Sequence, residues 1–308
     1  MKVLISDKLS EKGIEILKGH SDISLDINTD LSQEELIKCI GEYDALLVRS
    51  KTKVTRQVIE AAKRLKIIGR AGVGVDNIDL EAASQKGIIV MNTPGGNTIS
   101  AAEHAMSLLL ALARNIPQAH QSLKQDKWEK KRFLGTELYG KVLGIIGLGR
   151  IGSEVARRAL SFGMKIIAAD PYVSPEYALE RGVRLVSIDD LFSQADFISL
   201  HMPSSIETRH LINKAAIAKF KEGIRLINCA RGDLIDEEAL VEGLKDGRIK
   251  GAALDVFEKE PPHGSPLLNL ENVILTPHIG SYAKEARIRM EKMAVENLLE
   301  GLAEKGLI

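Results

Sequence analysis

Short apolar runs alternate with helical patterns along almost the whole chain, and this alternation constrains the fold more than any other feature. The first set of runs is KVLIS, ISLDI, ALLVRS, KIIGRA and IIVMN, with helix-like stretches such as SQEELIKCIGE and TRQVIEAAKRL between them. Brief β-branched runs that alternate with amphipathic segments predict βαβ units around a parallel sheet. The Gly- and Pro-containing segment NTPGGN, at residues 92–97, ends this set.

A second alternating set begins after a long helical stretch at about residues 100–123. The core of that stretch, AEHAMSLLLALAR, is apolar on almost every face, so we expect a buried helix. The runs that follow are KVLGIIG, KIIAAD, DFISLHM, GIRLINCA, AALDVF and NVILTPH, and a last helical pattern covers residues 282–304. Two successive sets predict an α/β protein with two doubly wound parallel-sheet domains. The pattern leaves open where the last helix packs.

The composition gives no sign of a nucleic-acid or membrane partner. Lys plus Arg and Asp plus Glu both number 42, so the formal net charge is zero. The apolar stretch AMSLLLALA is only about half as long as a membrane span. The two cysteines, Cys39 and Cys229, provide neither a disulfide framework nor a C-x-x-C metal spacing, and the N-terminus lacks the apolar core of a signal peptide. We therefore expect a cytoplasmic protein without a metal site.

A glycine motif opens the second set. Gly147, Gly149 and Gly152 form a G-x-G-x-x-G pattern directly after a predicted strand and at the start of a predicted helix. Such glycines allow a tight turn, a close approach to a pyrophosphate and close helix–strand packing. Asp170 ends the next strand, 18 residues past the last glycine, where a carboxylate accepts from ribose hydroxyls and repels a 2′-phosphate. The pattern predicts NAD rather than NADP, with Arg150 near the pyrophosphate.

Polar residues follow the strands of the second set, at the ends where doubly wound sheets bind ligands. They are His201, Arg231, Asp255, Glu258, Glu260 and His278.

Oxidation of a hydroxy acid needs a base, a partner that orients the base and a cation for the carboxylate. His278 suits the base because the ordinary histidine pKa is about 6.5. Glu260, before two prolines, is our choice for its partner, and the fork of Arg231 suits a carboxylate. Each residue also has a structural alternative: a solvated histidine, a surface glutamate, and an arginine paired with Asp233 or Asp236.

Several motifs in a fixed order resemble those of the D-isomer-specific 2-hydroxyacid dehydrogenases. They are GLGRIG, NCARGDLID, LDVFEKEPP and LTPHIGS, with LLVRSKTKVT, GRAGVGVDNIDL and NTPGGNTISAAEH before them, so the resemblance covers essentially the whole chain. It implies a flavodoxin-like substrate domain of residues 1–95 plus 281–308. It also implies a Rossmann NAD-binding domain of residues 96–280.

The resemblance also assigns roles to individual positions. It implies that Arg231, Glu260 and His278 are catalytic and that Arg49, Lys51, Arg70 and Asn97 bind the substrate, with cations for a phosphate. Positions that match NAD contacts are Gly147, Gly149, Arg150, Ile151, Gly152, Asp170, Met202, Cys229, Ala230, Asp255, Gly280 and Ser281. Many relatives have threonine where Met202 stands, so any contact there is expected to come from the main chain.

The expected activity is NAD-dependent oxidation of D-3-phosphoglycerate to 3-phosphohydroxypyruvate, the first step of serine synthesis. The alternatives are a glyoxylate/hydroxypyruvate reductase or another D-2-hydroxyacid dehydrogenase of the same family, and a non-catalytic NADH-sensing binding protein. The resemblance further implies a homodimer, in which the segment around Lys130, Lys131 and Arg132 approaches the partner subunit. A run of solvated surface charges explains these three residues equally well. Because the chain ends after one terminal helix, we expect no C-terminal regulatory domain.

Overall fold

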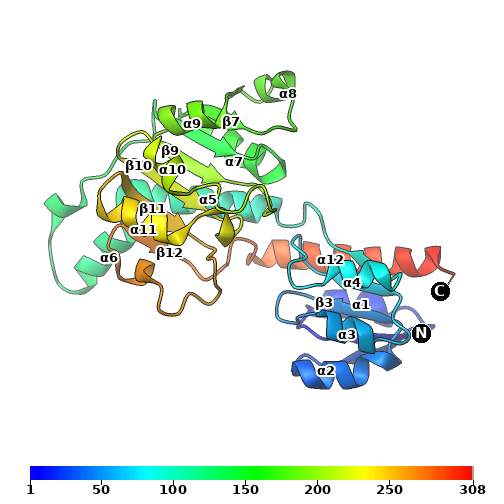
Figure 1. Cartoon of the computed structure of the whole chain (residues 1–308). Coiled ribbons are helices and arrows are strands. Elements are labelled where there is room, and N and C mark those ends of the chain that lie inside the picture. Colours follow the sequence, from blue (N-terminus) through cyan, green and yellow to red (C-terminus); the bar gives the residue numbers. More distant parts are fainter. Residues whose placement is uncertain (307–308) are drawn as a thin grey trace. The chain divides into compact units, whose positions relative to one another are not determined.

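The chain folds into two compact α/β units, each built on one parallel sheet. The structure, a computed structural model, describes residues 1–306. Unit 1 comprises Met1–Asn97 together with Tyr282–Ile308, and unit 2 comprises Thr98–Ser281. Figure 1 shows the path of the chain from one unit to the other and back. The predicted fold class, an α/β protein with two doubly wound parallel sheets, is confirmed.

Unit 1 contains a five-stranded parallel sheet with the order β2-β1-β3-β4-β5. Its strands are β1 (Lys2–Ile5), β2 (Ser24–Ile27), β3 (Ala45–Val48), β4 (Ile67–Arg70) and β5 (Ile89–Met91). Its helices are α1 (Glu11–Lys18), α2 (Gln33–Cys39), η1 (Ile40–Glu42), α3 (Arg56–Ala61), α4 (Leu80–Gln85) and α12 (Lys284–Glu304). All five apolar runs of the first set form the predicted strands.

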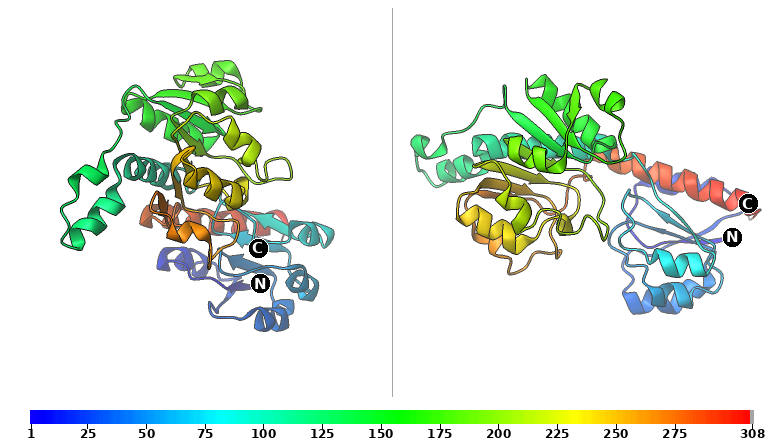
Figure 2. Two further views of the ribbon diagram at one scale, coloured as in Figure 1. Left: turned by 60° about the vertical axis from the view of Figure 1, so that its left-hand side comes forward. Right: turned by 45° about the horizontal axis from the view of Figure 1, so that its top comes forward.

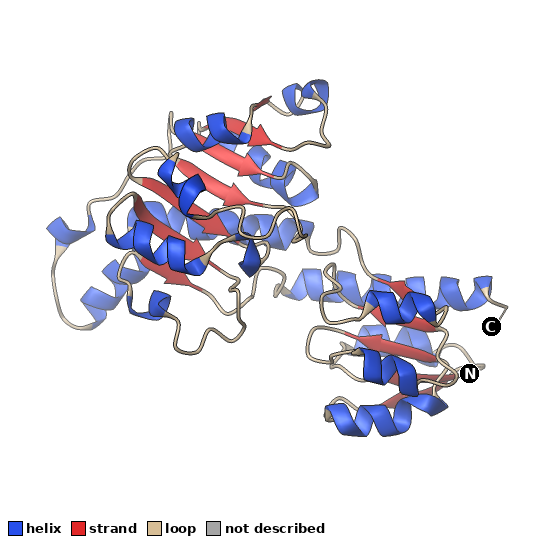
Figure 3. Cartoon of the chain, in the orientation of Figure 1, coloured by secondary structure: helices blue, strands red, loops and turns tan. Residues whose placement is uncertain are grey.

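Both faces of this sheet are covered, as its unbroken apolar strands require. Val3 and Ile5 of β1 pack with Leu17 of α1 and Val295 of α12, whereas Leu4 faces the core under α2, α3 and α4. Figure 3 shows helices on both sides of the sheet. The last helix therefore completes the core of the N-terminal unit, although it lies at the other end of the sequence.

Unit 2 contains a seven-stranded parallel sheet with the order β12-β11-β10-β9-β6-β7-β8. Its strands are β6 (Val142–Ile146), β7 (Lys165–Ala169), β8 (Val183–Leu185), β9 (Phe197–Leu200), β10 (Ile224–Asn228), β11 (Ile249–Leu254) and β12 (Val273–Leu275). The order reverses between β6 and β9, which is the switch point where such sheets bind ligands. The sequence pattern missed β8, because this edge strand has only three residues and one of them is the charged Arg184.

Helices cover both faces of the second sheet as well (Figure 2). Leu143 and Ile145 of β6 join the core under α5 and α7, and Ile146 joins the core under α9, α10 and α11. The helices of unit 2 are α5 (Thr98–Arg114), α6 (Ile116–Lys124), η2 (Lys130–Phe133), α7 (Arg150–Ser161), α8 (Pro175–Leu179), α9 (Ile188–Gln194), α10 (Lys214–Ala218), η3 (Gly232–Leu234), α11 (Glu237–Lys245) and η4 (Pro266–Asn269). No helix within residues 1–306 is long and apolar enough to cross a membrane.

The helical stretch expected at about residues 100–123 is present, but it forms two helices, α5 and α6, that are separated at Asn115. Asn115 adopts a left-handed conformation with φ 52°, which ends α5 and lets α6 start in a new direction. Asparagine tolerates this conformation better than most residues, and Pro117 near the start of α6 cannot donate a helical hydrogen bond to the preceding turn. The apolar part of the stretch is buried as predicted, from Ala101 to Ala113 on the inner face of α5.

Candidate active site

The glycine motif forms a tight turn between β6 and α7, at the switch point of the second sheet. Gly147 has φ 91°, and a Cβ there would lie 2.7 Å from the main-chain oxygen of His201. A Cβ on Gly152 would lie 2.1 Å from the Gly147 oxygen, so only glycine fits. A Cβ on Gly149 would meet no atom of residues 1–306 within 4 Å. The open side of the turn, at the start of a 12-residue helix, fits a pyrophosphate.

Asp170, at the end of β7, is fixed beside this turn. Its Oδ2 accepts a hydrogen bond from the Leu148 main-chain N at 2.8 Å, and its Oδ1 accepts one from Tyr172 N at 2.9 Å. The carboxylate is thus held next to the glycine turn and remains partly exposed, as a ribose-binding residue requires. Arg150, the first residue of α7, is exposed at the same turn. These residues fit NAD.

Arg231, Glu260 and His278 lie at the carboxyl ends of three neighbouring strands. Arg231 follows β10, Glu260 follows β11 and His278 follows β12, and these strands are neighbours in the sheet. His278 Nδ1 lies 2.8 Å from Glu260 Oε2, and the positive charge of Arg231 is near enough to act on the pKa of His278. The structure therefore brings all three side chains together.

The contact between His278 and Glu260 sets the protonation of both groups. The hydrogen bond with Glu260 raises the pKa of His278, and this effect exceeds the opposing effects of burial and of Arg231. Burial alone would raise the pKa of Glu260, but the hydrogen bond from His278 holds it below its ordinary value. An ionised carboxylate can only accept, so Nδ1 carries the proton in neutral His278 and Nε2 is the free basic nitrogen.

The other polar residues at the strand ends have partners elsewhere. Burial lowers the pKa of His201 to about 4, and its Nε2 lies 2.8 Å from Ser199 Oγ in β9. The Glu258 carboxylate contacts His210 Nε2. His201 is therefore neutral near pH 7, and neither residue competes with His278 for the role of base.

Asp255, at the end of β11, anchors the loop that carries His278. Its carboxylate accepts hydrogen bonds from Thr276 Oγ1 at 2.6 Å, from Ile279 N at 2.9 Å and from Gly280 N at 2.7 Å. These bonds hold both sides of His278, which has the left-handed φ of 52° that a non-glycine residue rarely adopts. Burial opposes ionisation of Asp255, but its donors keep its pKa below the ordinary value.

His104 is a member of this network that sequence reasoning missed. It lies on the buried helix α5, and its Nε2 is 3.2 Å from Asp255 Oδ1 and 3.1 Å from Thr276 Oγ1. No local signal marks it, because a single histidine in an apolar helix reads as a core residue. Only the packing of α5 against β11 and β12 brings it to the loop of His278.

The main chain around Arg231 is fixed by Asn228, the last residue of β10. Asn228 Oδ1 accepts from Ala230 N at 3.0 Å, and Asn228 Nδ2 donates to the Arg231 oxygen at 2.8 Å. Asp236 caps α11 by accepting from Glu238 N and Ala239 N, and Asp233 Oδ2 accepts from Ser204 Oγ. Asp236 thus acts as a helix cap, and Asp233 receives a hydroxyl donor in the short helix η3 before it.

The remaining residues that are expected near NAD lie close to the same carboxyl ends of the strands in unit 2. Cys229 and Ala230 follow β10, and burial raises the pKa of the Cys229 thiol, so the thiol stays protonated. Met202 follows β9 with its main chain beside the glycine turn. Positions that complete the set are Ile151 in α7, and Gly280 and Ser281 after β12.

The four expected substrate residues lie in unit 1. Arg49 follows β3, and Arg70 is the last residue of β4. The side chain of Asn77 connects them, because its Oδ1 accepts a hydrogen bond from Arg70 Nε at 3.2 Å and its Nδ2 donates one to the Arg49 main-chain oxygen at 2.7 Å. Lys51 is exposed and donates to the Thr29 oxygen at 2.8 Å, toward the loop after β2. Asn97 is the last residue of the N-terminal part of unit 1. Arg49 and Arg70 therefore belong to one network, whereas Lys51 points to another loop.

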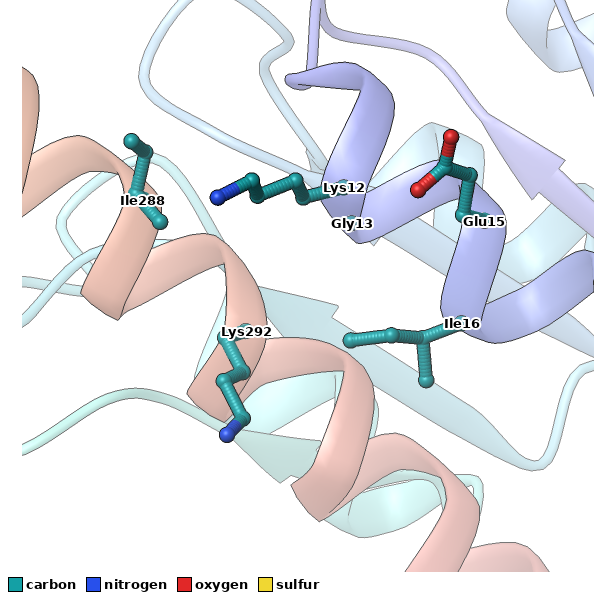
Figure 4. Close-up of a pocket in the computed structure, with 6 residues that line it drawn as sticks. All are labelled: Lys12, Gly13, Glu15, Ile16, Ile288 and Lys292. Atoms are coloured by element: carbon teal, nitrogen blue, oxygen red, sulfur yellow. The ribbon is translucent and has the colours of Figure 1, made fainter.

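A groove lies between α1 and α12 of unit 1. Figure 4 shows its lining, which is Lys12, Gly13, Glu15, Ile16, Ile288 and Lys292. The groove contains no histidine or arginine, and its two lysines are not directed at one point (Figure 4).

Comparison with known protein families identifies the family to which this chain belongs. The family model "D-isomer specific 2-hydroxyacid dehydrogenase, NAD binding domain" matches residues 106–280, which lie within unit 2. The chain belongs to the D-isomer specific 2-hydroxyacid dehydrogenase family, and unit 2 contains its NAD-binding domain.

The chain is also similar, over almost its whole length, to individual named proteins. It is 52% identical to the D-3-phosphoglycerate dehydrogenase of Synechocystis over 98% of the chain and 54% of that protein. It is 56% identical to the enzyme of the same name from Methanocaldococcus jannaschii over 93% of the chain and 55% of that protein. The chain thus spans about half the length of these relatives. A solved glyoxylate reductase from Paecilomyes thermophila matches with a TM-score of 0.90 and 35% identity, over 99% of the chain and 96% of that structure.

Proposed function

We propose that this protein oxidises D-3-phosphoglycerate to 3-phosphohydroxypyruvate with NAD, the first step of serine synthesis. The observation that carries the proposal is the 2.8 Å contact of His278 Nδ1 with Glu260 Oε2, beside Arg231 and in the same unit as the NAD-type glycine turn. The similarity to two D-3-phosphoglycerate dehydrogenases favours a phosphorylated substrate. Arg231, Glu260 and His278 are the catalytic residues in this proposal.

His278 is the base of the proposed reaction. Its Nδ1–H donates to Glu260, so Nε2 accepts the hydroxyl proton of the substrate, and Glu260 stabilises the imidazolium that forms. Arg231 holds the substrate carboxylate with its fork and polarises the forming carbonyl. Bound NAD supplies the hydride acceptor. Gly147, Gly149, Arg150, Ile151 and Gly152 are proposed to hold its pyrophosphate end.

The rest of the cofactor site is assigned in the same proposal. Asp170 binds the ribose hydroxyls. The nicotinamide half is held by Met202, Cys229, Ala230, Asp255, Gly280 and Ser281. Met202 has no polar side-chain atom for such a contact beyond its weakly accepting sulfur, so its contribution is a main-chain one. Both oxygens of Asp255 are already engaged by Thr276, Ile279 and Gly280, so its main contribution is the position of the loop.

Unit 1 is proposed to bind the substrate through Arg49, Lys51, Arg70 and Asn97. Three of these residues are cationic at neutral pH, which suits a substrate with both a carboxylate and a phosphate. Residues 1–95 with 281–308 then form the substrate domain, and residues 96–280 form the NAD domain.

A homodimer in the cytoplasm completes the proposal. The segment between α6 and β6 carries three large apolar side chains that are more than three-quarters exposed: Trp128 at 84%, Leu134 at 86% and Tyr139 at 80%. Exposed apolar groups of this size, here near Lys130, Lys131 and Arg132, are typical of an interface. Arg132 also donates to Glu271 at 2.6 Å. Sedimentation equilibrium should give twice the mass of the chain.

The substrate is tested by a panel of 2-hydroxy acids. NADH formation from D-3-phosphoglycerate is expected to exceed that from D-glycerate in kcat/KM, because unit 1 supplies cations for the phosphate. The same protein should be assayed in reverse with glyoxylate and hydroxypyruvate. Equal kcat/KM for D-3-phosphoglycerate and D-glycerate would overturn the phosphoglycerate assignment, and NADH binding without turnover of any acid would overturn the enzyme assignment.

The Glu260→Gln variant is expected to shift the pH profile in a defined direction. Oxidation needs neutral His278, so its rate falls as the pH drops through the raised pKa of His278; reduction needs the imidazolium and weakens above that pKa. Glutamine removes the charge that raises this pKa, so both limbs move to lower pH. Log kcat/KM against pH in both directions measures the shift. Profiles that match the wild type would show that Glu260 does not act on His278.

A further inference from the structure

His104 on α5 contacts the side chains that hold the loop of His278. Its Nε2 lies 3.2 Å from Asp255 Oδ1 and 3.1 Å from Thr276 Oγ1. The His104 side chain is 16% exposed and that of Asp255 is 1% exposed, so these contacts are largely shielded from water. All of these residues belong to unit 2. The contacts are therefore set by packing within one compact unit.

Only a hydrogen-bond donor at His104 satisfies both contacts. The Thr276 hydroxyl donates its one proton to Asp255 Oδ1 at 2.6 Å, so Thr276 Oγ1 offers only lone pairs to His104. The ionised Asp255 carboxylate likewise only accepts. An unprotonated Nε2 would face two acceptors, whereas a protonated Nε2 donates to both. His104 Nε2 therefore carries a proton.

The hydrogen bond from His104 stabilises the charge of Asp255. Burial raises the pKa of this carboxyl, and the hydrogen bond from His104 is the largest of the effects that lower it, ahead of one hydroxyl and two main-chain donors. Together these donors keep the pKa of Asp255 below its ordinary value. Loss of a donor to a buried carboxylate disfavours its ionised form. Asp255 therefore depends on a side chain from a distant part of the sequence.

The contacts of His104 and Asp255 reach both sides of His278. Thr276 lies two residues before His278, and Gly280 lies two residues after it. A Cβ on Gly280 would lie 3.1 Å from Asp255 Oδ2 and 3.7 Å from His104 Cδ2, so the carboxylate and the imidazole pack directly against the backbone there. His278 has a left-handed φ of 52°, which surrounding contacts must maintain. The pair supplies such contacts on both sides.

Two carboxylates and one guanidinium act on the pKa of His278. The hydrogen bond with Glu260 raises this pKa most and the charge of Asp255 raises it further, whereas burial and the charge of Arg231 lower it. A looser loop would weaken the Glu260 contact, and a protonated Asp255 would lose its charge. Both changes lower the pKa of His278, so His104 is linked to the base by two routes that act in the same direction.

We propose that His104 is a positioning residue for His278: it donates from Nε2 to Asp255 and Thr276, and so holds the loop in the conformation in which His278 contacts Glu260. This role rests on the proposed function, in which His278 accepts the hydroxyl proton of the substrate. His104 acts through Asp255 and the loop. The role requires a donor atom at the place of Nε2, so another side chain with a donor at that place should replace the histidine.

Two amide substitutions test the place of the donor. The amide nitrogen of glutamine reaches the place of Nε2, whereas that of asparagine falls near Nδ1. His104→Gln should therefore keep most of the wild-type kcat for D-3-phosphoglycerate. His104→Asn and His104→Leu should lower kcat about 10- to 100-fold, the range expected when a reacting group is slightly misplaced. Equal kcat values in His104→Gln and His104→Asn would overturn the proposal.

The pKa of His278, measured by NMR of the histidine ring protons, separates positioning from a general loss of structure. It should fall in His104→Leu and His104→Asn and stay close to the wild-type value in His104→Gln. A lower kcat in His104→Leu with an unchanged pKa of His278 would mean a merely structural role and would overturn the proposal. Ser107→Ala is the matched control, because Ser107 is exposed on the same helix and donates to the Glu103 main-chain oxygen at 2.8 Å. Changes in Ser107→Ala equal to those in His104→Leu would also overturn it.

A nitrogen NMR spectrum of the imidazole rings tests the donor directly. His104 is expected to carry a proton on Nε2, and an unprotonated Nε2 would overturn the proposal. Both NMR measurements are made without turnover. If the protein oxidises no hydroxy acid, the proposed function fails, but a pKa of His278 that falls in His104→Leu and not in His104→Gln still supports the positioning role. If His104→Leu does not fold, the comparison of His104→Asn with His104→Gln decides the result.

Discussion

The His278→Asn variant is expected to lose about 10²- to 10⁴-fold in kcat for D-3-phosphoglycerate oxidation, the usual contribution of a positioned general base. Asparagine keeps a polar side chain of similar reach but has no nitrogen that accepts a proton near pH 7. The acid limb of the kcat/KM profile should disappear with the histidine, because the group whose raised pKa defines that limb is gone. Steady-state kinetics between about pH 6 and pH 10 give both quantities.

Binding must be separated from catalysis in this experiment. Asp255 holds the loop through Thr276, Ile279 and Gly280, not through the imidazole, so the variant should keep the loop and bind NADH as the wild type does. His263→Asn is a suitable control, because His263 is exposed and follows Glu260 by three residues. Near wild-type kcat with an unchanged pH profile in His278→Asn would remove this histidine from the mechanism.

Much of the fold follows from local sequence. Continuous β-branched runs identify eleven of the twelve strands, because strands buried on both faces need apolar side chains at every position. The three-residue edge strand β8, Val183–Leu185, lacks this signal and was missed. The break at Asn115 was missed for another reason: helical segments lie on both sides of it, and only the left-handed backbone at one residue changes the direction.

The candidate site was predictable where it depends on strand ends. Arg231, Glu260 and His278 each follow a strand, so the topology of a parallel sheet brings them to one edge even though 47 residues separate the first from the last. The supporting groups were not predictable in this way. His104 comes from a helix packed against the sheet, and its contact with Asp255 depends on tertiary packing that leaves no local pattern.

The Arg231→Ala variant is expected to lower kcat/KM for D-3-phosphoglycerate by about 1.5–3 kcal/mol in transition-state stabilisation, roughly 10- to 150-fold, the usual contribution of a hydrogen bond to a charged group. The loss should appear in KM as well as in kcat, because Arg231 is proposed to hold the carboxylate before reaction and to polarise the carbonyl during it. The pKa of His278 should also rise slightly further, since the Arg231 charge opposes its protonation.

Arg231→Lys separates the charge of the arginine from its geometry. Lysine keeps the positive charge but offers no planar fork, so it should restore only part of the lost kcat/KM if the substrate carboxylate is bound by two parallel hydrogen bonds. Arg248→Ala provides a matched control in the same unit, because Arg248 donates to the Phe220 oxygen away from the strand ends. Full recovery in Arg231→Lys would show that only the charge is needed, and an unchanged kcat/KM in Arg231→Ala would place the carboxylate elsewhere. The NADH dissociation constant should change little in all three variants, because the glycine turn and Asp170, which are proposed to hold the pyrophosphate and the ribose, follow β6 and β7 rather than β10.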